Sequence, residues 1–292
     1  MSRDSVEASF MKAALRHSGY ATKTKVRMCT TYLALSDVAK AGRWGECAPT
    51  KLTEKQLARF VETRRGQVSA RAVQNEMSHI RAALRGAGRA EFAAQMTNER
   101  LGVPAGTRKG TGREVAADVY AQALARADVE TRVYIELQRA LGLRIDELVQ
   151  SHKDLKVWAK HLEAGRSFVT IRAGTKGGRV RDTHLTPEGR VRALEAVRQA
   201  IALAASRPTG YLVDSDNGEA ACKQVGERYA RLGLKGDNSS HALRRAFAVE
   251  NFRHYRAEGY ADVRALELVS RDLGHGDGRG RWIFNNYGLA YV

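Results

Sequence analysis

Six residues at four places in the second half of the chain have the side-chain types that phosphoryl transfer requires. They are Arg144 in ALGLRIDELV, Lys176 in GTKGG, His241 and Arg244 in HALRRAFA, and His275 and Tyr287 in GHGDGRGRWIFNNY. Two guanidiniums can clamp the non-bridging oxygens of a phosphate and stabilise a pentavalent transition state. A lysine can protonate the leaving oxygen, a histidine can relay a proton, and a tyrosine can attack as a covalent nucleophile. Together these groups could cleave a phosphodiester without a metal.

Each residue alone has a plainer interpretation. An arginine beside an Asp-Glu pair, as Arg144 is, is typical of a surface ion pair, and a turn lysine is typically solvated. A histidine three residues before an arginine shares a helix face with it, which is common. The order and combination of the residue types therefore favour the catalytic interpretation, and no single residue does.

The elements that must position these residues can be read from the sequence pattern. Helical patterns extend to about Gln150, and the β-branched segments SFVTIRA and RVRDTHL flank GTKGG, which predicts a β-hairpin with Lys176 near its tip. Thr186-Pro187 is a good helix start, and helical patterns continue to Leu273. Four glycines at alternate positions predict that residues 274–287 form a flexible loop that delivers the tyrosine.

The first hundred residues are expected to be helical. A helix is expected over about residues 23–40, and Thr53 can cap a helix in a capping box with Gln56. Ser69 opens a further helix that ends at Gly86. The segment GVPAGTRKGTGR has the composition of a basic linker. The expected domains are therefore 1–105, a linker over 106–113, and 114–292.

The net positive charge of the chain indicates a polyanionic partner. The 292 residues carry a formal net charge of +17, and residues 1–105 hold 18 Lys and Arg against 9 Asp and Glu. The excess is spread over both halves, which favours two folded pieces that face a phosphate backbone over a basic tail. A generally basic protein with solvated faces is the alternative.

Other composition features limit the class of protein. The cysteines Cys29, Cys47 and Cys222 are odd in number and form no C-x-x-C pair, so neither a disulfide framework nor a zinc site is expected. The start of the chain has no apolar signal region, and no long apolar run follows. We expect a cytoplasmic, nucleoid-associated protein without a membrane partner.

These motifs resemble those of the tyrosine recombinases, the family of phage-type integrases and bacterial site-specific recombinases. GLRIDEL resembles the family's first arginine box, HALRRAFA its H-x-x-R box, and LGH its third box, with a tyrosine near the chain end. TKGGRVRDTHLT resembles the catalytic-lysine hairpin. The resemblance covers residues 113–287 by motif, and it implies a mainly α fold with a small β-hairpin. It also implies an all-α N-terminal DNA-binding domain that forms a C-shaped clamp with an α+β catalytic domain.

The resemblance implies a role for each residue. Arg144 and Arg244 would clamp the phosphate, and Lys176 would be the general acid for the 5′-oxygen. His241 would be a general base or a hydrogen-bond donor to the phosphate, and His275 a second hydrogen-bond donor. A supporting acidic residue is implied at Glu147, and the nucleophile that forms the 3′-phosphotyrosine would be Tyr287. No cofactor is implied.

Two features depart from the family pattern. The usual gap between the LGH histidine and the tyrosine is shorter, and the ordinary spacing would place the nucleophile at Phe284. The alternative nucleophile is Tyr291, and Trp282 is expected to anchor the loop. The tail after Tyr287 is also short, whereas family members commonly extend it to dock on a neighbouring subunit.

The activity implied is site-specific recombination, as in DNA integration by a mobile genetic element, through a Holliday junction. The partners implied are duplex DNA with a specific site, a homotetramer on that DNA, and accessory DNA-bending proteins. The alternatives are a type IB topoisomerase-like nicking and closing enzyme, and a catalytically degenerate DNA-binding protein. The DNA-binding candidates are Arg71, Gln74, Asn75, Arg108, Lys109 and Arg113.

Overall fold

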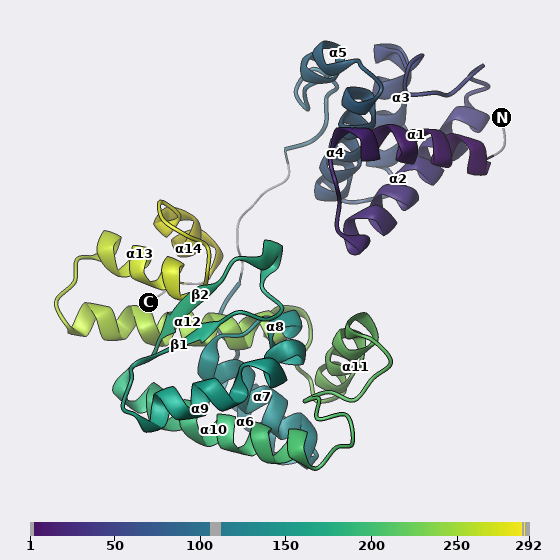
Figure 1. Cartoon of the computed structure of the whole chain (residues 1–292). Coiled ribbons are helices and arrows are strands. Elements are labelled where there is room, and N and C mark those ends of the chain that lie inside the picture. Colours follow the sequence, from purple (N-terminus) through teal and green to yellow (C-terminus); the bar gives the residue numbers. More distant parts are fainter. Residues whose placement is uncertain (1–2, 106–111, 288, 290–292) are drawn as a thin grey trace. The chain divides into compact units, whose positions relative to one another are not determined.

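The structure is a computed structural model that describes residues 3–105, 112–287 and 289. The chain divides into two compact units, Met1–Arg108 and Lys109–Val292, each with its own hydrophobic core (Figure 1). Among the described residues, no helix is both long enough and apolar enough to cross a lipid bilayer.

The first unit is helical in its described part. Its helices are α1 (Arg3–His17), α2 (Thr22–Ala41), α3 (Glu54–Arg65), α4 (Ala70–Gly86) and α5 (Ala90–Gln95). The expected starts are confirmed: Thr53 and Gln56 form a capping box, and the Ser69 hydroxyl accepts the Ala72 N–H. The core includes fully buried Phe10 and Tyr32. Helices α1 and α4 lie so close that a Cβ at Gly86 would be 1.8 Å from the Ala13 carbonyl oxygen.

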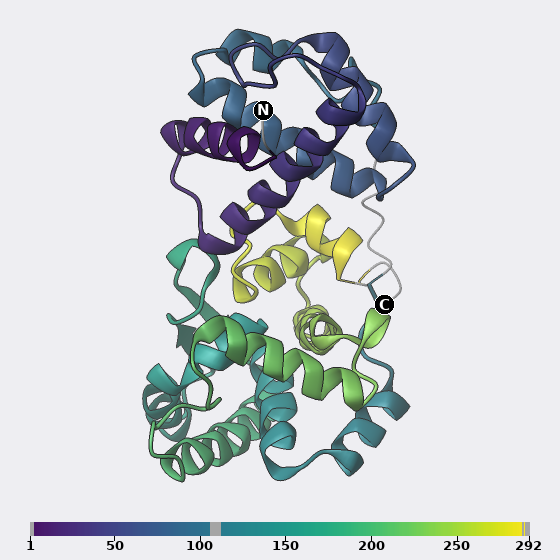
Figure 2. The ribbon, with the colours of Figure 1, turned by 90° about the vertical axis from the view of Figure 1, so that its right-hand side faces the viewer.

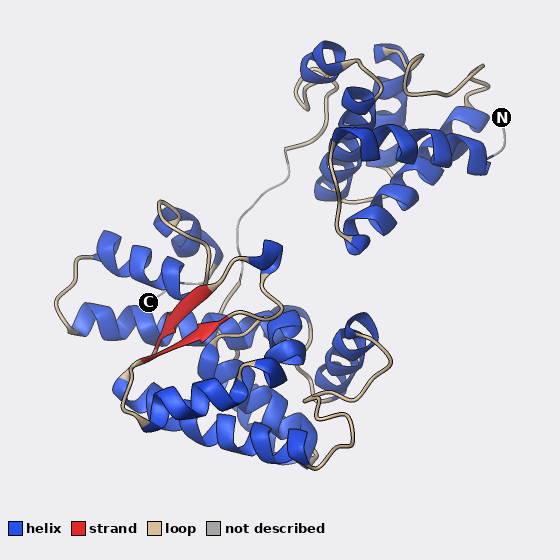
Figure 3. Cartoon of the chain, in the orientation of Figure 1, coloured by secondary structure: helices blue, strands red, loops and turns tan. Residues whose placement is uncertain are grey.

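The second unit is mainly helical with one small sheet (Figures 2 and 3). Its α-helices are α6 (Ala117–Arg126), α7 (Val129–Leu141), α8 (Ile145–Gln150), α9 (Leu155–Glu163), α10 (Pro187–Ala205), α11 (Gly218–Arg231), α12 (Ser240–Ala257), α13 (Asp262–Asp272) and α14 (Gly280–Asn286). The 3₁₀ turns are η1 (Ser151–Lys153), η2 (Lys176–Gly178) and η3 (Gly236–Asn238). The expected mainly α fold with a β-hairpin is confirmed.

The strands β1 (Phe168–Ile171) and β2 (Arg181–His184) pair antiparallel, with Phe168 opposite His184. Lys176 lies in the turn between them, as expected. The predicted start of α10 is also confirmed, because the Thr186 hydroxyl accepts the Gly189 N–H.

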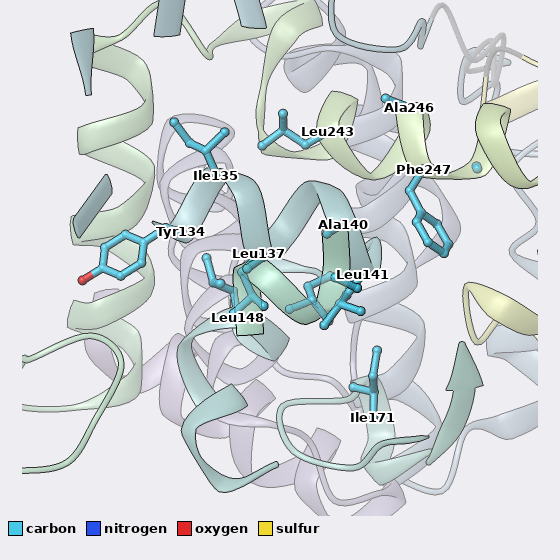
Figure 4. Close-up of a cluster of buried hydrophobic side chains, with 14 of the residues drawn as sticks. Tyr134, Ile135, Leu137, Ala140, Leu141, Leu148, Ile171, Leu243, Ala246 and Phe247 are labelled. Atoms are coloured by element: carbon cyan, nitrogen blue, oxygen red, sulfur yellow. The ribbon is translucent and has the colours of Figure 1, made fainter. Parts of the chain in front are cut away.

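The core of this unit lies around α7, and Figure 4 shows part of it. Leu137 and Leu141 of α7 lie among side chains from α8, β1 and α12, including Leu148, Ile171 and Leu243. Helix α7 ends at Leu141 and is capped by Gly142, which has φ +57°, and a Cβ at Gly142 would lie 2.5 Å from the Phe247 ring. This turn leads through Leu143 to Arg144, the residue that directly precedes α8.

The expectation of a loop over residues 274–287 is wrong in its second half. The alternating glycines end at Gly280, and residues 280–286 form the helix α14. Ile283 of this helix is fully buried, and a Cβ at Gly280 would lie 3.2 Å from Leu266 of α13. Burial of an apolar face against α13 therefore outweighs the weak local helix signal. Tyr287 is therefore the residue that directly follows a packed helix, at its C-cap.

Candidate active site

Most of the residues that the sequence singles out meet at one place in the second unit. Arg144 precedes α8, His241 and Arg244 lie on α12, His275 follows α13, and Tyr287 follows α14. The carboxylate of Glu147 lies among them. Four helices distant in sequence therefore contribute to one cluster.

The hydroxyl of Tyr287 is held by two of these groups. Its Oη accepts a hydrogen bond from Arg244 Nε at 3.2 Å and lies 2.9 Å from His275 Nε2. The Tyr287 side chain is fully buried, and its ring packs against Trp282 with the ring centroids 5.9 Å apart. Because an arginine can only donate, the hydroxyl proton is free to point toward the histidine.

The Arg244 guanidinium is fully buried and directed by backbone oxygens. Its Nη1 donates to the Gly142 carbonyl, and its Nη2 donates to the Leu273 carbonyl. Arg144 shares the second acceptor, because its Nη2 lies 3.4 Å from the Leu273 oxygen. The Arg144 side chain is 23% exposed, so it is the member of the pair that solvent reaches.

Glu147 provides the negative charge of the cluster. Its Oε1 accepts from Arg144 Nη1 at 2.6 Å, and its Oε2 accepts the Arg144 backbone N–H at 2.8 Å. Burial alone would raise the pKa of this carboxyl, but the charges of Arg181, Arg244 and Arg144 lower it to about 2. Glu147 is therefore ionised at neutral pH.

Arg181 is a member of this cluster that sequence reasoning missed. It lies on β2, and its Nη2 donates to Glu147 Oε2 at 2.7 Å while its Nη1 donates to the Asp272 carbonyl. Burial lowers its pKa to about 10, so it stays charged. The alternation in RVRDTHL was the available signal, because an inward-facing strand position places Arg181 on the same face as Thr183. Arg144, Arg181 and Arg244 are called the guanidinium cluster below.

The two histidines of the site are neutral at pH 7. Desolvation and the charges of Arg244 and Arg144 lower the pKa of His275 to about 3. The His241 residue is exposed overall, but its ring lies 5.5 Å from that of Tyr287. Desolvation by the surrounding atoms and the charge of Arg245 lower the pKa of His241 to about 4. A neutral imidazole can accept a proton, and that of His275 lies beside the Tyr287 hydroxyl.

Lys176 is not brought into the cluster. It is exposed on the η2 turn and makes no hydrogen bond or ion pair with any residue that the structure describes. The base of its hairpin is fixed nonetheless. Asp154 accepts the backbone N–H groups of Arg172 and Ala173, and a Cβ at Gly174 would lie 2.3 Å from the Asp146 carbonyl oxygen. The hairpin therefore packs directly against the backbone of α8 at Gly174.

The remaining candidates lie elsewhere. Arg71 and Asn75 are exposed on α4, while the Gln74 amide donates to the Pro104 carbonyl at 2.9 Å. Arg113 is exposed at the start of the second unit. Arg108, Lys109 and the alternative nucleophile Tyr291 lie outside the described residues. Phe284, which stands at the ordinary family spacing, is 39% exposed and is therefore not part of the buried cluster.

Trp282, which was expected to anchor a loop, lies on the helix α14. Its ring lies 4.5 Å from the His275 ring, centroid to centroid. This contact joins α14 to His275 in the turn between α13 and α14.

Comparison with known proteins gives a family match. The family model described as Integrase matches residues 102–250. No curated protein sequence matches the chain.

Solved structures show the same fold at low sequence identity. The Tn1549 transposon integrase in complex with transposon right end DNA has a TM-score of 0.61 at 14% identity, covering 97% of this chain and 94% of that one. A lambda integrase dimer bound to a COC′ core site has a TM-score of 0.59 at 18% identity, covering 98% and 77%. The XerH site-specific recombinase bound to palindromic difH substrate has a TM-score of 0.56 at 18% identity, covering 99% and 83%.

Proposed function

Because the chain belongs to the integrase family of tyrosine recombinases, we propose that it cleaves and rejoins duplex DNA at a specific site through a 3′-phosphotyrosine. The observation that carries this proposal is the placement of one buried hydroxyl. Tyr287 Oη lies between Arg244 Nε and His275 Nε2, beside a cluster of three guanidiniums. A nucleophile, a proton acceptor and groups that bind a phosphate thus meet in one place.

In the proposed cleavage step, Tyr287 Oη forms a bond to the scissile phosphorus, and the bond from phosphorus to the 5′-oxygen breaks. The tyrosine proton passes to His275 Nε2, since that nitrogen lies 2.9 Å from the hydroxyl. His241, whose ring lies 5.5 Å from that of Tyr287, centroid to centroid, serves as a hydrogen-bond donor to the phosphate. A bound phosphate also offsets the arginine charges that lower the pKa of His275, which increases its basicity.

Lys176 supplies the proton for the leaving 5′-oxygen in this proposal. Because it is exposed at the tip of the hairpin, DNA binding must bring its Nζ to the scissile phosphate. The phosphotyrosine keeps the energy of the phosphodiester, so attack by a 5′-hydroxyl rejoins the strand without ATP. The guanidinium charges stabilise the pentavalent state, so no metal is included.

The phosphate clamp also needs a rearrangement. Arg244 is fully buried, so a phosphate reaches its guanidinium only after a covering group moves. Each of its Nη atoms gives one hydrogen to a backbone carbonyl and keeps a second one for the phosphate. Arg144, which is partly exposed, is the first of the two that DNA meets.

The proposed course of strand exchange is taken from the solved structures of similar fold. Strand exchange would proceed through a Holliday junction held by a homotetramer, as the lambda integrase tetramer is bound to a Holliday junction. The first unit would contact the duplex through exposed residues of α4 such as Arg71 and Asn75. Its net positive charge, 18 basic against 9 acidic residues up to position 105, supports that role.

The test begins from a library of nicked duplexes with a randomised central segment, because the target sequence is unknown. Wild-type protein that becomes covalently joined to DNA is recovered on denaturing gels, and the attached duplexes are sequenced. Recovery of one consensus supports site-specific cleavage, and the consensus duplex then serves as substrate.

Two outcomes would contradict the proposal. Relaxation of supercoiled plasmid without any consensus would favour a topoisomerase-like enzyme. Specific binding of DNA without any covalent adduct would favour a degenerate DNA-binding protein.

A further inference from the structure

Asp272, the last residue of α13, carries a buried carboxylate that is held by four donors. Its Oδ1 accepts the His184 backbone N–H at 3.2 Å and lies 2.9 Å from the His184 ring Nδ1. Its Oδ2 accepts from the Asn251 amide at 3.0 Å and from the Tyr255 hydroxyl at 2.8 Å. The donors come from β2 and α12, so this carboxylate ties the end of α13 to two other elements.

The backbone of the same residue faces the guanidinium cluster. The Asp272 carbonyl accepts from Arg181 Nη1 and, at 2.9 Å, from Thr183 Oγ1. The next carbonyl, of Leu273, accepts from Arg244 Nη2 and is shared with Arg144. Two consecutive carbonyls therefore direct all three guanidiniums.

The chain has little freedom to shift at this point. Gly274 has φ +66°, and a Cβ there would lie 2.6 Å from Arg181 Cδ. The next residue is His275, which contacts the Tyr287 hydroxyl. A displacement of the Asp272 backbone would therefore move the acceptors of the arginines and the partner of the tyrosine together.

We propose that Asp272 is a positioning residue for the site: its carboxylate fixes the two carbonyls that aim Arg144, Arg181 and Arg244 at the scissile phosphate. Asp272 lies outside the three boxes, and its hydrogen-bond partners are Arg181, Thr183, His184, Asn251 and Tyr255. The inference rests on the proposed function, because its consequence is a slower cleavage step. Reacting groups must be held within a fraction of an ångström, so a small misalignment of the guanidiniums is costly.

The substitution Asp272→Asn keeps the shape of the side chain but replaces one acceptor oxygen with an NH₂ group. That group meets either the His184 donors or the Asn251 and Tyr255 donors, so one side of the network is lost. Tyr255→Phe is a milder variant that removes one donor only. Its matched control is Tyr134→Phe, which removes a buried hydroxyl from the same unit, where Tyr134 Oη donates to the Leu212 carbonyl at 3.0 Å.

The experiment measures covalent adduct formation in single turnover on the selected nicked duplex, at saturating DNA concentration. We expect the rate constant to fall by about 10- to 100-fold for Asp272→Asn, in the range that misplacement of reacting groups costs. A smaller fall is expected for Tyr255→Phe, and none for Tyr134→Phe, although both tyrosine variants lose thermal stability. The dissociation constant for the duplex should stay near the wild-type value.

A second substrate isolates the guanidiniums. A methylphosphonate at the scissile position lacks the charge that the arginines stabilise, so the Asp272→Asn defect should shrink on it. A purely structural role would instead lower the melting temperature and the amplitude of the reaction, and leave the rate constant and the substrate dependence unchanged. That result would overturn the inference.

The outcomes separate the inference from the proposed function. If wild-type protein forms the adduct and both Asp272→Asn and Tyr255→Phe form it at the wild-type rate constant, only the inference is wrong. If wild-type protein forms no adduct on any duplex, the proposed function fails and the inference fails with it.

Discussion

The hydroxyl of Tyr287 lies 2.9 Å from Nε2 of His275, although the two residues are twelve positions apart in the chain and a helix lies between them. The contact exists because α13 and α14 pack side by side, with the glycines between them forming the turn (Figure 1). It places the proposed nucleophile next to a base that is neutral at pH 7. The proposed cleavage step depends on that pair.

The protonation of the two histidines gives the first prediction. The pKa values of His275 and His241 are about 3 and about 4 in the folded protein, against an ordinary value of 6.5. Between these values the unfolded chain binds protons that the folded chain does not, so the free energy of unfolding falls as the pH is lowered from 6.5 toward 4. Urea unfolding of wild type and His275→Gln at several pH values measures this effect. We expect the wild type to lose more stability, and parallel curves would contradict the prediction.

The role of Lys176 gives the second prediction. Lys176→Ala should slow cleavage by about 10²- to 10⁴-fold, the usual contribution of a general acid. A duplex with sulfur in place of the bridging 5′-oxygen should restore the rate, because a thiolate leaves without a proton. The control is Lys156→Ala, which alters an exposed lysine of α9 and should change neither rate. An equal loss on both duplexes would exclude Lys176 as the proton donor.

The hairpin base gives the third prediction. Gly174→Ala should destabilise the protein, because its Cβ would overlap the Asp146 carbonyl, and it should slow cleavage by displacing the hairpin from α8. Gly259→Ala is the matched control, since Gly259 has φ +90° and open space around its Cβ position. The positive φ alone costs an alanine about 1–2 kcal/mol, which both variants share. Chemical unfolding and cleavage rates should show an additional loss for Gly174→Ala, and equal losses would refute the clash.

The buried carboxylate gives the fourth prediction. Glu147→Gln leaves three guanidiniums without a counter-ion, and loss of one partner from a buried ion network costs about 3–5 kcal/mol of stability. The folded pKa of Glu147 is lowered to about 2, so this contribution is complete above pH 4.5 and is lost as the pH falls toward 2. Unfolding at pH 7 and at pH 3 should show the difference between wild type and variant narrowing in acid.

A control for this prediction is Glu163→Gln. Glu163 pairs with Arg198 at the surface, where both side chains are about half exposed, so its removal should cost less than about 1 kcal/mol. A loss for Glu147→Gln as small as that of the control would contradict the network.

Much of the fold could be predicted from local sequence. The helix starts at Thr53, Ser69 and Thr186 have polar caps whose effect is confined to a few residues, and all three are confirmed. The hairpin around Lys176 was also evident from its β-branched flanks. Helix α14 was not, because its stability comes from burial of Ile283 against α13, a contact between segments that local patterns do not report.

The site was predictable by residue type and not by geometry. Arg144, Arg244 and Tyr287 could be chosen because their chemistry is distinctive, and the structure brings them together. The place of Arg181 was not predictable, because an arginine in a short strand is usually exposed. Its burial depends on the Glu147 carboxylate and the Asp272 carbonyl. Local sequence patterns do not predict contacts with residues as distant in the chain as Glu147 and Asp272.

The amino acid that becomes joined to DNA decides whether Tyr287 is the nucleophile. Wild type, Tyr287→Phe and Tyr291→Phe are incubated with the selected nicked duplex, and the adducts are digested and sequenced by mass spectrometry. We predict that wild type and Tyr291→Phe carry the 3′-phosphate on Tyr287, and that Tyr287→Phe forms no adduct while it still binds the duplex. An adduct formed by Tyr287→Phe, or a DNA-linked peptide that contains Tyr291 in place of Tyr287, would contradict the account.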